Sequence, residues 1–253
     1  MARLYKFALT LVVCAAFGLF TSAKADTIQI ITPSNPQGWA PANVQPGGSA
    51  AITNTNPRSG DGSVEMSTNG SGAKADFQLV QNFGTLSSLT NLSIDTFRDG
   101  LSTADPNLNA AFRLVFQNAS GQFGQLIWER VYNLPGATPL DQWVTNNMTQ
   151  DHFWLKYFGQ PAVEEFDHNL TFWQGDSRVG NASIVGINFG VGSGWAGTFH
   201  GFADNVSING TTYNFEVNNA TATPEPMTAL LLGTGLAGVA AKLRRRRKGG
   251  EEV

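Results

Sequence analysis

Two carboxylates near the middle of the chain have a spacing that could support acid–base chemistry. Glu165 and Asp167 are separated by one residue, so on a β-strand both side chains would point to the same face of the sheet. Retaining glycosidases use such a pair of carboxylates as nucleophile and as acid/base. The alternative is a solvated acidic loop, in which the two side chains share no task.

The acidic run at residues 164–168 resembles the Glu-x-Asp-x-x-Glu signature of laminarinase-like glycosidases, which are built on concanavalin-like sandwiches. The resemblance implies a glycan-active hydrolase that uses Glu165 and Asp167. Asn169 and Leu170 stand where the final glutamate is expected, so the general acid is missing and the loop is favoured. The chain also lacks H-E-x-x-H zinc spacing and a G-x-S-x-G nucleophile elbow. We therefore predict no catalytic residues and keep the hydrolase as the alternative function.

Tryptophan side chains offer flat apolar faces on which sugar rings can stack. All six tryptophans lie between residues 26 and 223, at Trp39, Trp128, Trp143, Trp154, Trp173 and Trp195. Most of them are interpreted as core or strand-edge residues. Trp195 is flanked by Gly194 and Gly197 and is expected to be exposed, so it is the predicted glycan contact.

Hydrophobic residues alternate with polar or small ones in residues 26–222, as in half-buried strands of an antiparallel sheet. The clearest alternations are Leu92/Ile94, Phe112/Leu114/Phe116, Val185/Ile187/Phe189/Val191 and Tyr213/Phe215/Val217. Asn209-Gly210 separates two such runs with the spacing of a type I′ hairpin. We predict one all-β domain, an antiparallel two-sheet sandwich of the jelly-roll type, without any helix longer than two turns. Residues 33–60 are expected to form an irregular entry passage.

Asp204 lies in a run in which Phe202, Val206 and Ile208 have the same parity. A regular strand would bury the carboxylate beside these apolar side chains, which is costly unless the charge is paired. Three outcomes are open. A cation could bind the carboxylate, a β-bulge could turn it to solvent, or an arginine or backbone amides could pair with it.

Several short segments resemble the strand landmarks of carbohydrate-binding-module-like and galactose-binding-like jelly rolls. They are Gly38-Trp39, residues 60–64, residues 89–95, Gln142-Trp143 and residues 201–206. The resemblance implies a jelly-roll fold and polysaccharide binding. It also implies a structural Ca²⁺ ion held in part by Asp204, because such modules place an aspartate before Asn-Val as a ligand. Calcium prefers clustered oxygen ligands.

The C-terminal region has the order of a membrane-sorting signal. A Pro224-Glu225-Pro226 motif precedes an uncharged apolar stretch at residues 227–241, and the basic run at 242–248 follows. Fifteen helical residues reach about 22 Å, less than the bilayer core of about 30 Å. The basic run is expected to stay in the cytoplasm, which places the preceding domain across the membrane. A permanent tail anchor and a transient sorting handle both remain open.

These three parts, in order at residues 223–248, resemble the signal of PEP-CTERM proteins of Gram-negative, exopolysaccharide-producing bacteria. The resemblance implies recognition of Pro224, Glu225 and Pro226 by the membrane protease exosortase, and a membrane stop formed by Arg244, Arg245, Arg246 and Arg247. It further implies release to the cell surface or the extracellular space. The extension at residues 249–253 departs from the family, whose tails usually end sooner.

The N-terminus has the features of a secretory signal peptide. Arg3 and Lys6 precede an apolar run, and Ala23 and Ala25 occupy the small positions that signal peptidase requires. Residues 1–25 are therefore predicted to be removed during export across the inner membrane. The only cysteine, Cys14, lies in this segment, so the exported chain would contain no disulfides.

Residues 26–223 are strongly acidic, with seven Lys and Arg against sixteen Asp and Glu. An acidic domain repels phosphate, so nucleic acid is not an expected partner. The sequence thus predicts an exported, non-catalytic envelope or matrix protein, with polysaccharide as a candidate ligand. A purely structural matrix protein and the glycan hydrolase are the alternatives.

Overall fold

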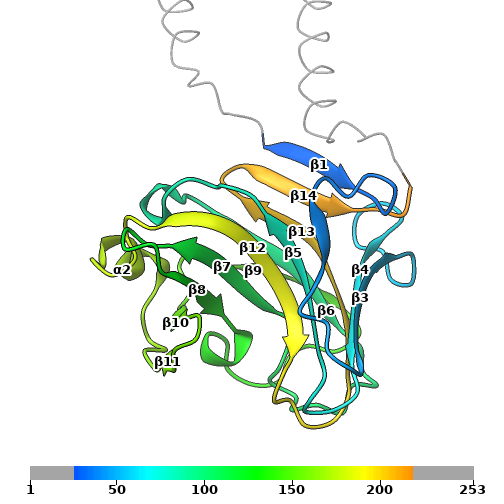
Figure 1. The fold of residues 1–253 in the computed structure, drawn as a ribbon. Helices are drawn as coiled ribbons and strands as arrows, with labels where there is room; N and C mark the ends of the chain where they lie inside the picture. The colour runs from blue at the N-terminus through cyan, green and yellow to red at the C-terminus, as the bar shows by residue number, and fades with distance from the viewer. Residues whose placement is uncertain (1–25, 219–253) are drawn as a thin grey trace, which may run out of the picture. The chain divides into compact units, whose positions relative to one another are not determined.

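The computed structural model describes residues 26–218, which form the domain drawn in colour in Figure 1. The predicted signal peptide with Ala23 and Ala25, the sorting signal at 223–248 and the tail at 249–253 lie outside the described residues. Within residues 26–218, no helix is both long enough and apolar enough to cross a membrane.

The domain is an all-β sandwich of two seven-stranded sheets, as the alternation of the sequence predicts. The first sheet contains β1 (Thr27–Ile31), β3 (Gly48–Thr53), β4 (Ser63–Thr68), β6 (Leu92–Arg98), β9 (Trp143–Asn147), β13 (Phe199–Ile208) and β14 (Thr211–Phe215). The second sheet contains β2 (Trp39–Ala42), β5 (Lys74–Val80), β7 (Ala111–Gln117), β8 (Phe123–Trp128), β10 (Trp154–Tyr157), β11 (Ala162–Val163) and β12 (Ser183–Gly192). Its strand order is β11-β10-β8-β7-β12-β5-β2. The pairs are antiparallel except β1 with β14, which is parallel.

Helical structure within residues 26–218 is limited to short turns. These are the 3₁₀ turns η1 (Leu86–Ser88) and η2 (Arg130–Tyr132) and the six-residue helix α2 (Leu170–Gly175). Asn169 caps α2, since its side-chain oxygen accepts a hydrogen bond from the Phe172 amide. The described part of the chain therefore agrees with the prediction of helices no longer than two turns.

Aromatic rings from both sheets meet in the core between them. Trp39 of β2 stacks on Phe77 of β5 and meets Phe215 of β14 edge-on, with ring centroids 5.9 and 5.0 Å apart. Phe189 of β12 packs against the same group. The predicted inward-facing residues Phe112, Leu114 and Phe116 of β7 and Leu92 and Ile94 of β6 are all buried. Interlocking of these rings joins the sheets and keeps their inner faces dry.

The Asn209-Gly210 hairpin is confirmed between β13 and β14. Both residues have positive φ, 51° and 77°, which a type I′ turn requires. The entry passage is less irregular than predicted, because residues 33–60 include β2 and β3. Proline and glycine in this segment hid short edge strands, where a missing amide donor is tolerated.

Two β-bulges overturn parts of the predicted alternation. A register shift between Ile184 and Gly186 places Ile184, not Val185, in the core of β12. A second shift, between Asp204 and Ser207, moves Phe202 to the opposite face from Val206 and Ile208. An extra residue in a strand reverses the side-chain alternation beyond it, which a period of two cannot foresee.

Candidate functional site

The outer face of the second sheet, turned away from the core, carries an ordered array of polar and aromatic side chains. Residues paired directly across strands project on the same side, and one such row crosses five strands. It runs Trp154, Ile127, Arg113, Asn188 and Gln78. The alternation that sends Phe112 and Leu114 into the core therefore sends Arg113 outward. We call this surface the outer face.

A charged cluster forms the floor of the outer face. The Asp76 carboxylate accepts hydrogen bonds from Arg113 Nη1 at 3.0 Å and Asn43 Nδ2 at 2.8 Å, and Lys74 Nζ lies 3.2 Å away. Arg113 Nη1 is also 3.0 Å from the Asn188 side-chain oxygen. Asp76 has no exposed surface, so its charge is held by these partners rather than by water.

Glycine at position 190 makes room for the Asp76 carboxylate. Gly190 pairs with Asp76 across β12 and β5, and a Cβ atom added there would lie 2.1 Å from Asp76 Oδ1. The carboxylate can therefore pass over β12 and reach Arg113 on β7. This close approach fixes the position of the charged cluster on the sheet.

Aromatic rings border the cluster on the side of β8 and β10. Trp154 Nε1 donates to Glu129 Oε2 at 3.0 Å, and the indole packs against Phe166, whose ring stacks on Tyr132 at 4.4 Å. Burial raises the pKa of Glu129, although its bond to the indole partly opposes this. The hydrogen bond fixes the orientation of the indole, and a fixed ring binds a ligand with little loss of side-chain entropy.

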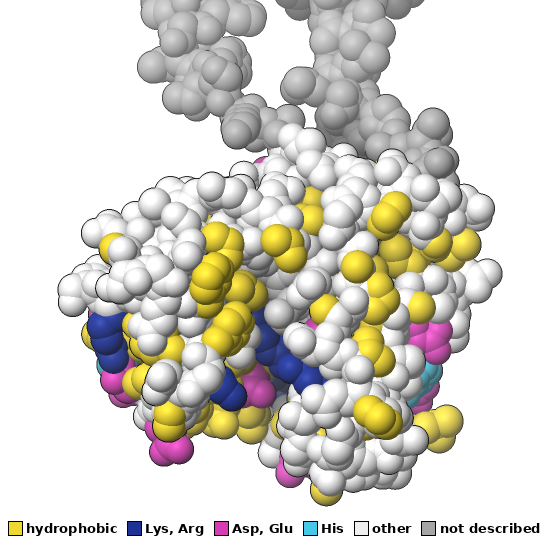
Figure 2. Space-filling view, viewed as in Figure 1, with side chains coloured by type: hydrophobic (Ala, Val, Ile, Leu, Met, Phe, Trp, Pro, Cys, Tyr) yellow, Lys and Arg dark blue, Asp and Glu magenta, His cyan; other side chains and the backbone are white. Residues whose placement is uncertain are grey.

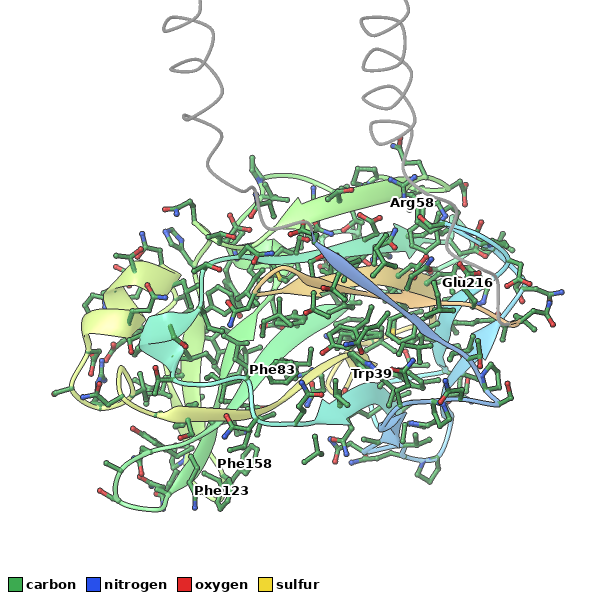
Figure 3. The ribbon with its side chains drawn as sticks, turned by 90° about the horizontal axis from the view of Figure 1, so that it is seen from above. Trp39, Arg58, Phe83, Phe123, Phe158 and Glu216 are labelled. Atoms are coloured by element: carbon green, nitrogen blue, oxygen red, sulfur yellow. The ribbon has the colours of Figure 1, made fainter. Side chains whose placement is uncertain are left out.

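A second aromatic pair is formed by Phe123, the first residue of β8, and Phe158, in the turn directly after β10. Phe123 is 44% exposed, Phe158 is 49% exposed, and the Phe158 amide donates to the Phe123 carbonyl at 3.0 Å. Figure 3 shows these two phenylalanines close together. In Figure 2, basic and acidic side chains lie in a recess near the centre of the visible surface, between hydrophobic side chains. Exposed rings beside convergent polar groups are typical of sites that bind small molecules or glycans.

Trp195 does not have the predicted exposure. Its side chain is only 8% exposed and meets Phe199 edge-on at 5.3 Å. The neighbouring glycines suggested an open loop, but the indole folds back onto the core. A ring covered in this way has no free face for a sugar, so the basis for a glycan contact at Trp195 is lost.

Asp204 is buried as predicted, although the bulge beside it breaks the shared parity with Val206 and Ile208 on which the prediction rested. Its Oδ1 accepts hydrogen bonds from the Asn205 and Phe215 amides at 2.8 and 2.9 Å. The other oxygen, Oδ2, has no hydrogen-bond partner among the described residues. Burial raises the pKa of Asp204 to about 8. Backbone amides thus pair with one oxygen, and the other prefers a proton.

The expected calcium ion finds little support around Asp204. The unpartnered Oδ2 is a suitable ligand, and Glu216 lies close enough to raise the pKa of Asp204 further. Across residues 26–218, however, no three His, Cys, Asp or Glu side chains converge to hold a metal ion. Calcium binds six to eight oxygens with carboxylates prominent among them, so these residues do not fit the ion well.

The geometric premise of the hydrolase alternative is wrong. Glu165 and Asp167 lie in a turn after β11 and not on a strand, so they share no sheet face. Arg178 pairs with Glu165 Oε2 at 2.9 Å and lowers the pKa of that carboxyl, while the Asp167 side chain is 83% exposed. The solvated acidic loop describes these residues correctly.

The residues of the outer face were missed as a site by the sequence analysis. The sequence places Trp154 among core and strand-edge residues and presents Arg113 only as one of seven cations. One signal was present, since an arginine between Phe112 and Leu114 in an alternating strand must face away from the core. The strand order that brings Arg113, Asp76 and Trp154 onto one surface is not encoded in any local pattern.

The fold defines the class as an all-β two-sheet sandwich, and solved structures of this kind are similar to it. No family model and no curated protein matches the chain. One similar structure is a family 11 carbohydrate-binding module from Clostridium thermocellum in complex with a β-1,3-1,4-mixed-linked tetrasaccharide (11% identity, TM-score 0.38, covering 72% of this chain and 91% of that one). Another is CBM28, a module specific for non-crystalline cellulose (12% identity, TM-score 0.38, covering 73% of this chain and 97% of that one). A third is the cellulose-induced protein Cip1 (15% identity, TM-score 0.36, covering 72% of this chain and 94% of that one). These values do not place the chain in a family.

Proposed function

We propose that this protein is an exported, non-catalytic protein that binds polysaccharide on the outer face of its second sheet. One observation carries the proposal: the half-buried Trp154 ring, the exposed Phe123 and Phe158 rings and a fixed polar cluster share a single sheet surface. Trp154 and the Phe123–Phe158 pair border this surface, and Arg113 and Asp76 form its floor. Both elements are held by contacts within the domain.

The two parts of the surface suit the two sides of a sugar. The apolar face of a pyranose ring stacks on an aromatic side chain, which removes water from both. Hydroxyl groups at the ring edge can bond to partly exposed amides, and Gln78 and Gln125 supply such groups from β5 and β8. Because strands rather than loops carry most of these groups, little ordering is required on binding.

Replacing Trp154 with alanine is expected to weaken polysaccharide binding at least about tenfold. Truncating a central stacking aromatic commonly costs on the order of 2 kcal/mol, and each 1.4 kcal/mol is a factor of ten. Affinity electrophoresis in gels containing hydroxyethyl cellulose, barley β-glucan, polygalacturonate or alginate measures the effect. Trp143→Ala is the matched control, since Trp143 packs on Phe97 in the first sheet.

Equal retardation of wild type and Trp154→Ala in each gel that retards the protein would contradict binding at the outer face. Loss of retardation in Trp143→Ala alone would place the binding surface on the first sheet. The melting temperature of each variant shows whether a lost interaction reflects loss of the fold.

The proposal includes a route to the cell exterior. Signal peptidase cleaves after Ala25, the segment at 227–241 holds the precursor in the inner membrane of a Gram-negative bacterium, and exosortase acts at Pro224-Glu225-Pro226. The basic run including Arg244–Arg247 keeps the tail in the cytoplasm. The protein then resides at the cell surface or outside the cell. The order of the sequence signals supports this route.

Intact-mass measurement of the protein from the producing organism is expected to give a chain that starts at Asp26 and ends near residues 224–226. The short apolar segment makes a stable anchor unfavourable, which suits transient retention followed by cleavage. A membrane-bound form that retains Val253 would instead establish a permanent tail anchor.

A further inference from the structure

Cations are concentrated on the outer face of an otherwise acidic domain. Residues 26–223 contain seven Lys and Arg against sixteen Asp and Glu. Lys74, Arg113 and Lys156 belong to the outer face by their strand parity, whereas Asp76 and Glu129 are the carboxylates beside them. The other four cations of residues 26–223 are outnumbered by the other fourteen carboxylates. Glu164 follows β11 at the rim, outside the sheet itself.

The charges on the outer face do not cancel locally. Lys74 and Arg113 both pair with the single Asp76 carboxylate, at 3.2 and 3.0 Å. Glu129 accepts a hydrogen bond from the Trp154 indole, and burial raises its pKa, while the indole and the charge of Arg113 oppose that rise. Three cations, Lys74, Arg113 and Lys156, therefore share the outer face with two carboxylates, Asp76 and Glu129, and a ligand anion would balance the excess.

Lys156 adds a cation between the two aromatic groups. It lies on β10 opposite Gln125 of β8 and two residues from Trp154, so both β10 side chains point outward. Phe158 follows in the turn directly after β10, where its amide bonds to the Phe123 carbonyl. The spacing along a strand puts Lys156 about 7 Å from Trp154. Among the described residues, no carboxylate lies within ion-pair distance of Lys156. Its ammonium is available to a ligand bound across these rings.

We propose that the outer face selects acidic polysaccharides, and that Lys156 pairs with a uronate carboxylate between sugar rings stacked on Trp154 and Phe158. The inference rests on the proposed glycan binding and adds the chemical class of the glycan. Charge complementarity supports it, because the rest of the domain repels a polyanion and leaves this face as its point of attachment.

Calorimetric titration with polygalacturonate and with its fully methyl-esterified form tests the proposal, because the two polymers share a backbone and differ in charge. At low ionic strength, wild type is expected to bind polygalacturonate at least about fivefold more tightly, as one Coulomb contact at the surface provides. Added salt is expected to reduce the preference. Lys156→Met is expected to lose the preference and Lys156→Arg to keep it. Arg58→Gln is the control, since Arg58 pairs with Asp95 on the first sheet.

The outcomes separate this proposal from the one on which it rests. Equal affinity for the two polymers, or an undiminished preference in a folded Lys156→Met variant, overturns the selectivity for acidic glycans. If the esterified polymer or barley β-glucan is still bound in a way that depends on Trp154, glycan binding itself stands. Failure to bind any of these polymers overturns both proposals. A preference lost equally in Arg58→Gln would show general charge attraction and would also overturn the role of Lys156.

Discussion

Replacing Asp76 with alanine is expected to lower the free energy of unfolding by about 3–5 kcal/mol, the usual cost of removing one partner from a buried ion pair. Asp76 is fully buried, and its carboxylate holds Arg113, Lys74 and Asn43. Without it, the Arg113 guanidinium remains largely buried with only the Asn188 oxygen as an acceptor. Because domains of this size have a total stability of about 5–15 kcal/mol, urea denaturation would detect this loss readily.

The double variant Asp76→Ala/Arg113→Met separates the pair itself from the cost of an orphaned charge. Removing both partners leaves no buried guanidinium, so the double variant is expected to be more stable than Asp76→Ala alone. Gly190→Ala is expected to destabilise the domain as well, because a Cβ atom there would lie 2.1 Å from Asp76 Oδ1 and 2.5 Å from the Ala75 carbonyl oxygen. A loss below about 1 kcal/mol in Asp76→Ala would show that water replaces the carboxylate, and the cluster would not be a fixed floor.

Much of the fold could be predicted from the sequence because burial imposes a simple period on a sandwich strand. Phe112, Leu114 and Phe116 alternate with outward residues, and this pattern alone identifies β7 and its inner face. The prediction failed where backbone geometry interrupts the period. At the bulges beside Ile184 and Asn205, one extra residue reverses the alternation without any marked change in composition.

The site was harder to predict because it depends on the order of strands in the sheet. Arg113 and Asp76 are 37 residues apart, and the strand that separates their two strands, β12, comes from much later in the chain. Trp195 shows the opposite error, since its flanking glycines predict an exposure that the folded domain does not give it. Glycine permits an unusual backbone path, but it does not determine whether a neighbouring ring turns inward or outward.

The Asp204→Asn variant is expected to be more stable than wild type near pH 8 and equally stable near pH 4. Burial raises the pKa of Asp204 from 3.8 to about 8 in the folded state. Between these values the folded state keeps a proton that the unfolded state has lost, so stability falls as pH rises. The slope for one such group is about 1.4 kcal/mol per pH unit, which limits the total to about 6 kcal/mol. Above pH 8, where Asp204 is ionised in both the folded and the unfolded state, its contribution to stability no longer changes with pH.

The asparagine side chain keeps the acceptor for the Asn205 and Phe215 amides and removes the charge from the unpartnered oxygen. Burial also raises the pKa of Glu216, which is present in both proteins, so the difference between the two pH curves reports Asp204 together with its coupling to Glu216. Thermal unfolding from pH 4 to 9, in EDTA and in calcium, gives the measurement. If the stabilities of wild type and Asp204→Asn change with pH in the same way in EDTA, the raised pKa of Asp204 is contradicted. A calcium-dependent gain in wild type that is absent from Asp204→Asn would show that a cation, rather than a proton, neutralises this carboxylate.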